Sequence, residues 1–166
     1  MFKTAALIST AALTLAAITS PAMAQSFAPT SSSATLSGTL NLQQTQNINC
    51  QTDIGVSINS AGAATVTSRS FGPGPHWTCG WIVTPQGSWT VAAGGAVPGT
   101  SNEYYVTANV GAQSIAGTCY GTITGIFNNT AHTLTFDNEV IPSTNPQDCY
   151  VSGVLTDSTL SLTVVP

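Results

Sequence analysis

The sequence predicts an all-β fold, an antiparallel β-sandwich or barrel with two similar disulfide-closed halves. Apolar and polar residues alternate in short runs throughout the chain, which is the period of a half-buried strand. Stretches rich in Gly, Pro, Asn and Ser separate these runs, as they do in sandwiches and barrels. The four cysteines fall in two segments that resemble each other in layout.

The first 24 residues have the layout of a cleaved signal peptide. Lys3 precedes a short apolar stretch, and residues 22–24 (Ala-Met-Ala) have the small-x-small form that signal peptidase cuts. We expect cleavage after residue 24 and a secreted or cell-surface protein. The apolar stretch is too short and too Thr-rich to span a bilayer, and no transmembrane segment is expected elsewhere. Residues 25–33 are expected to form a flexible lead, and residues 34–166 a single β domain.

The alternation locates the expected strands in chain order. Each run is short and ends at turn-forming residues, and no stretch after the leader shows a convincing period of 3.6 residues. The clearest runs are TLSGTLNL at 35–42, DIGVSIN at 53–59, AATVTS at 63–68, TLTFDN at 133–138 and TLSLTVV at 159–165.

The composition argues against a nucleic-acid partner. Only 5% of the residues are charged, and without the leader Arg69 is the only Lys or Arg, against six acidic residues. Phosphate binding needs a cluster of such cations. An uncharged, Thr-rich, β-prone surface is instead typical of extracellular proteins that adhere to surfaces or to each other.

Residues 50–84 and 119–156 form an internal repeat. Each segment opens with Cys, has Ile four residues later, reaches an Asn turn, and meets a second Cys after a Pro-containing loop. Four cysteines in an exported chain suggest two disulfides and allow three pairings. Equivalent bonds in the two halves favour Cys50–Cys79 and Cys119–Cys149. The spacings contain no C-x-x-C pair, which argues against zinc.

No residues point to catalysis. His76 and His132 lie in expected loops, no G-x-S-x-G elbow occurs, and the cysteines are expected to be oxidised. Asp137 and Glu139 would share one strand face, whereas glycosidase carboxylates face each other across a cleft. We therefore expect no catalytic residue, no metal and no cofactor, and a protein that is not an enzyme.

The aromatic residues are the candidates for contact with a partner. Trp77, Cys79 and Trp81 share one strand face by parity. The repeat matches Trp81 with an apolar residue, which places it in the core, and Trp77 with a glutamine, which places it nearer the rim. Trp89, Tyr104 and Tyr105 flank the Gly-rich connection AAGGAVPGTSNEYY at 92–105. The candidate surface-contact residues are Trp77, Trp89 and Tyr105.

The stretches "NINC", "CYGTITGIFNNTAHTLTF" and "DCYVSGVLT" resemble the small secreted proteins called protein activators of alkane oxidation, the Pra type. The likeness covers most of the chain after the leader and lies in the placement of cysteines and strands. It implies an extracellular accessory protein, not an enzyme, that helps cells to use or adhere to hydrophobic substrates. It implies no active-site residues.

The leading hypothesis is a non-enzymatic accessory protein at the cell surface or at a hydrophobic interface. Its partners would be a hydrophobic substrate or cell-surface material. An alternative is a fimbrial or biofilm-matrix subunit that self-associates by exchanging edge strands such as residues 35–42 and 159–166. A third is a carbohydrate-binding module that uses exposed aromatic rings.

Overall fold

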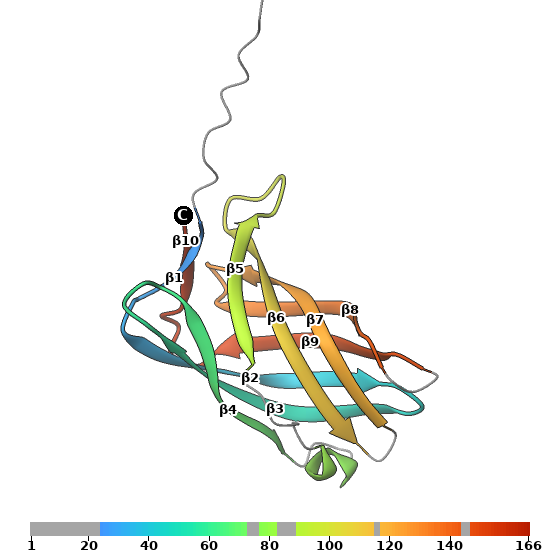
Figure 1. The fold of residues 1–166 in the computed structure, drawn as a ribbon. Coiled ribbons are helices and arrows are strands. Elements are labelled where there is room, and N and C mark those ends of the chain that lie inside the picture. Colours follow the sequence, from blue (N-terminus) through green and yellow to red (C-terminus); the bar gives the residue numbers. More distant parts are fainter. Residues whose placement is uncertain (1–23, 73–76, 83–88, 115–116, 144–146) are drawn as a thin grey trace, which may run out of the picture.

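Eight strands close into an antiparallel barrel in the computed structural model (Figure 1), in which each strand neighbours the next along the chain and the last pairs with the first. The structure describes residues 24–72, 77–82, 89–114, 117–143 and 147–166. The all-β prediction is confirmed, with a barrel as the observed form. The strands are β2 (Ser32–Gln43), β3 (Asn47–Ile58), β4 (Ala64–Gly72), β5 (Thr90–Ala96), β6 (Glu103–Ser114), β7 (Gly117–Asn128), β8 (Thr133–Ile141) and β9 (Cys149–Asp157).

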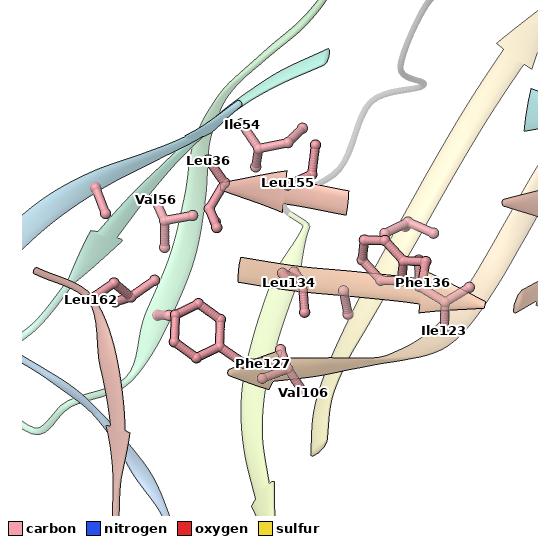
Figure 2. Close-up of a cluster of buried hydrophobic side chains, with 14 of the residues drawn as sticks. Leu36, Ile54, Val56, Val106, Ile123, Phe127, Leu134, Phe136, Leu155 and Leu162 are labelled. Atoms are coloured by element: carbon pink, nitrogen blue, oxygen red, sulfur yellow. The ribbon is translucent and has the colours of Figure 1, made fainter. Parts of the chain in front are cut away.

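The core lies inside the barrel. Alternate residues of each strand point inward, so the alternation that predicts the strands also supplies the core. Leu36 of β2 stands opposite Ile54 of β3, and both are buried. Figure 2 shows side chains from several strands meeting in the interior, among them Phe127 of β7 and Leu134 of β8.

Two short strands at the ends of the described chain form a separate sheet. β1 (Ser26–Ala28) pairs with β10 (Thr163–Val165), and Phe27 and Val164 stand opposite each other with 3% and 1% of their surfaces exposed. The N-terminal segment expected to be a flexible lead therefore contains an ordered strand. A strand of three residues is too short to show alternation, and its partner lies at the other end of the sequence.

The segment expected to carry Trp77, Cys79 and Trp81 on a strand is instead a 3-10 helix, η1 (Trp77–Trp81). Cys79 is fully buried, and its carbonyl accepts a 3.1 Å hydrogen bond from the N–H of Ile82. In a segment of five residues, apolar side chains at alternate positions fit a 3-10 helix as well as a strand. His76 and the side chains of both tryptophans lie outside the described residues. No helix in the described ranges is long and apolar enough to cross a membrane.

The strand ladders differ greatly in length around the barrel. β2 pairs with β3 over its whole length and with β9 from Leu36 onward, so residues 35–42 are not the edge strand that the fimbrial alternative assumes. β8 and β9 share seven register pairs. Among the described residues β4 and β5 share two, Ala64 with Val91 and Thr65 with Thr90. We call this short ladder and the ends of the strands beside it the β4–β5 seam.

Candidate functional site

The four cysteines form two disulfides at one end of the barrel. Cys50 bonds to Cys79 and Cys119 to Cys149, with Cα–Cα distances of 5.5 and 6.1 Å. This is the pairing that the internal repeat predicts. No cysteine is free, so no thiol is available as a nucleophile or as a metal ligand. The two bonds suggest an oxidising, extracellular environment.

The titratable side chains make structural contacts. Nδ1 of His132 lies 3.0 Å from the carbonyl oxygen of Leu162, which can only accept, so this nitrogen donates. Glu139 Oε2 accepts a 3.0 Å hydrogen bond from the N–H of Thr124, which joins β8 to β7 beyond their short ladder. Within the described part of the chain no three His, Cys, Asp or Glu side chains gather to hold a metal ion.

The carboxyl of Asp157 has a lowered pKa. It is fully buried at the end of β9. Burial by itself would raise its pKa, but hydrogen bonds from Leu162, Thr159 and Ser161 outweigh it and hold the pKa below the usual 3.8. The carboxylate thereby fixes the turn that leads from β9 into β10.

The barrel encloses an apolar cavity of about 100 Å³. Its lining comes from strands all around the wall and includes Leu36, Val106 and Phe127, and none of the described residues that line it is charged. Eight-stranded barrels have interiors that are either filled by side chains or wide enough for one small ligand. Cavities lined in this way stay dry and admit apolar molecules. The chemistry of this site therefore favours hydrocarbon.

Trp89, expected at the surface, lines this cavity and packs against the core. The Cζ atom of Arg69 lies 5.0 Å from the centre of its ring, within the range of a cation–π contact. The indole Nε1 is buried and has no hydrogen-bond partner among the described residues. The sequence missed this position because Trp89 stands one residue before β5, where the alternation of a strand does not fix which way a side chain points.

Other apolar side chains are more exposed than Tyr105, the other described candidate, which is 38% exposed on β6. Leu160, between β9 and β10, is 60% exposed. On β7, β8 and β9 the exposed fractions are 63% for Tyr120 and 44% each for Val140 and Val154. The N–H of Tyr120 bonds to Pro142, two residues beyond Val140, and Val140 stands opposite Tyr150. Val154 lies farther along β9, opposite Thr135. We call these side chains on the outer face of the three strands, Tyr120, Val140, Tyr150 and Val154, the outer patch.

The sequence contained the information for the outer patch. Cys119, Ile141 and Leu155 are buried, and each adjoins an exposed member of the patch along its strand. Period-two alternation puts neighbours on opposite faces, so these apolar neighbours of core residues had to face outward.

The whole chain, residues 1–166, matches the family model described as alkane oxidation protein activator PraA/PraB-like. The chain belongs to this family. No curated protein and no solved structure matches it significantly. The PraA/PraB-like description names an activator, which is consistent with an accessory role in alkane oxidation. An apolar cavity and an apolar outer patch are two features of this barrel that fit such a role.

Proposed function

We propose that this protein is a secreted, non-enzymatic accessory protein that acts at the cell surface or at a hydrophobic interface and promotes alkane use or adhesion. The observation that carries the proposal is the outer patch, a group of exposed apolar side chains on neighbouring strands. Export would follow cleavage of the leader after residue 24, and the two disulfides are consistent with that destination.

Adsorption through the outer patch is favoured by the burial of apolar area and costs little desolvation. Removing apolar surface from water stabilises the adsorbed state by about 25 cal/mol per Å². The charges that would oppose transfer to oil are sparse, since charged residues make up 5% of the chain. In a closed barrel the backbone N–H and C=O groups of the strands are hydrogen-bonded to each other. Moving them from water to oil therefore does not leave them without partners.

Adsorption to n-hexadecane droplets tests the proposal. Interfacial tension is measured with rising concentrations of the exported protein. The variant Val140→Lys/Val154→Lys should require about tenfold more protein for the same fall in tension, because it loses apolar area and must desolvate two ammonium groups. Ser33→Lys/Gln51→Lys is the matched control, with the same added charge at exposed positions on β2 and β3.

The control should behave as the unmodified protein does. The proposal fails if the unmodified protein leaves the tension unchanged, or if both double variants lose the same activity. The second result would show that net charge alone, and not the outer patch, governs adsorption. Growth on hexadecane by cells that export each variant gives the corresponding biological readout.

A further inference from the structure

We propose that the barrel interior binds the alkyl chain of a single fatty acid, with the carboxylate at Trp89 and Arg69. The choice of ligand class rests on the proposed function, since fatty acids are terminally oxidised alkyl chains. The site is distinct from the outer patch: one lies inside the barrel and the other on the outer face of β7 to β9.

The cavity suits an alkyl chain. Its volume of about 100 Å³ is somewhat smaller than that of an engineered core cavity of about 150 Å³ that takes up benzene. Aliphatic and aromatic side chains from β2 to β9 form its wall, so a saturated chain would meet apolar atoms throughout. A short alkyl segment fits this space, and a longer chain would have to continue toward the seam.

The polar end of the proposed site is provided by Trp89. Its indole Nε1 is a donor that is buried without an acceptor, although buried donors in folded proteins nearly always have one. The same side chain lines the cavity. A bound molecule with an oxygen acceptor at one end of an alkyl chain would satisfy both observations.

Arg69 supplies the charge that selects a carboxylate. It stands directly opposite Ile54 in the β3–β4 ladder, and Ile54 lines the cavity, so Arg69 lies on the inner face of β4. Its guanidinium lies over the Trp89 ring. The only cation of the sequence beyond the leader is therefore placed beside the orphan donor. Guanidinium and a neighbouring N–H are a suitable pair for a carboxylate.

Trp89 lies beside β4 at the polar end of the proposed site. Its carbonyl accepts a 3.2 Å hydrogen bond from the N–H of Val66, three residues before Arg69 on β4. A carboxylate held between the Arg69 guanidinium and Nε1 of Trp89 would lie beside the cavity that Trp89 lines, with its chain pointing into it.

Calorimetric titration of the exported protein with sodium decanoate, below its micelle concentration at pH 8, tests the proposal. We expect saturable binding at one site. Arg69→Gln should weaken decanoate binding about tenfold or more, while Arg69→Lys keeps the charge and retains most of the affinity. Trp89→Phe removes the donor but keeps an aromatic ring, and should weaken binding about threefold.

Decanol separates the two polar contributions. Its hydroxyl can accept from Nε1 but carries no charge, so Trp89→Phe should weaken decanol binding and Arg69→Gln should not. Decane, which has no acceptor, should bind more weakly than decanoate or decanol, and neither substitution should change its affinity. Near-UV circular dichroism and thermal unfolding show that each variant is folded, and the decanol series provides a second test if Arg69→Gln is not.

The inference is overturned if the unmodified protein does not bind decanoate saturably, or if Arg69→Gln and Trp89→Phe bind it as tightly as the unmodified protein. Val140→Lys/Val154→Lys should bind decanoate normally. This variant separates the two proposals: loss of droplet adsorption with normal decanoate binding supports both, whereas normal adsorption without decanoate binding leaves the proposed function standing and removes the fatty-acid site.

Discussion

Replacing Asp157 by Asn tests how the C-terminal strand is held to the barrel. Oδ1 of Asp157 accepts from the N–H and hydroxyl of Thr159 at 2.9 and 2.7 Å. Oδ2 accepts from the N–H groups of Ser161 and Leu162 at 2.9 and 2.8 Å. The amide of Asn has one acceptor oxygen, so its NH₂ group must face donors that the carboxylate now satisfies.

The magnitude follows from counting those donors. If the Asn oxygen keeps Ser161 and Leu162, the hydroxyl of Thr159 can turn to accept one N–H of the amide, and the second N–H at this fully buried position is left without a partner. A buried donor without an acceptor costs about 1–3 kcal/mol, and hydrogen bonds to charged groups are stronger than those to neutral ones. We expect Asp157→Asn to lower the free energy of unfolding by about 2–4 kcal/mol at pH 7.

The pH dependence of the free energy of unfolding tests the same prediction independently. The pKa of Asp157 in the folded protein is lowered from 3.8, so its carboxylate stabilises the fold fully above about pH 3.8, and this stabilisation is lost as the pH falls through the folded pKa. The Asn variant has no such group. The difference between the two proteins should therefore be largest at neutral pH and shrink below about pH 3.8.

Urea unfolding followed by circular dichroism at pH 7 and at a series of acidic pH values measures both effects. Asp137→Asn, an exposed position on β8, is the matched control and should change stability by less than about 0.5 kcal/mol. Hydrogen exchange should show faster exchange at the Val164 amide in Asp157→Asn. Equal stability of the two variants, or a difference that does not shrink in acid, would refute the account of this turn.

Three further outcomes are expected. Replacing Cys50 and Cys79 by Ala should lower the free energy of unfolding by about 3.5 kcal/mol, because the bond closes a loop with a sequence separation of 29; a shift below about 1 kcal/mol in urea would contradict this. Gly153→Ala should destabilise the fold by about 1–3 kcal/mol, because Gly153 has φ +136° and an added Cβ would lie 2.5 Å from the Thr39 carbonyl oxygen. Thermal unfolding measures the change, and Gly95→Ala is the control, since a Cβ added there meets nothing within 4 Å. Phe127→Ala should cost about 3–5 kcal/mol, measured by urea unfolding, because a ring 1% exposed is removed from the core; a cost below about 1 kcal/mol would show that the barrel collapses around it.

Local patterns were sufficient for the strands and for the disulfides. Leu36 and Ile54 were assigned to inward faces by alternation alone, because the period of a strand is a local property. The pairing of Cys119 with Cys149 followed from the likeness of the two halves. Neither inference needed knowledge of which strands are neighbours.

Features that depend on distant parts of the chain could not be predicted in the same way. Pairing of β2 with β9 closes the barrel, and the choice between a barrel and a sandwich depends on that contact. Pairing of β1 with β10 likewise joins residues from opposite ends of the sequence. The position of Trp89 at the cavity depends on its contact with Arg69 of β4, twenty residues earlier in the sequence. In each case the deciding contact is tertiary, and alternation carries no information about it.

The two halves differ structurally at the point where the proposed polar site lies. In the second half, Cys149 begins β9, which pairs at once with β8 and continues for seven register pairs. In the first half, Cys79 lies in η1, and among the described residues the next strand is β5, which shares two register pairs with β4. Arg69 of β4 and Trp89, which precedes β5, lie together in this half beside the cavity, where a polar end group could be held.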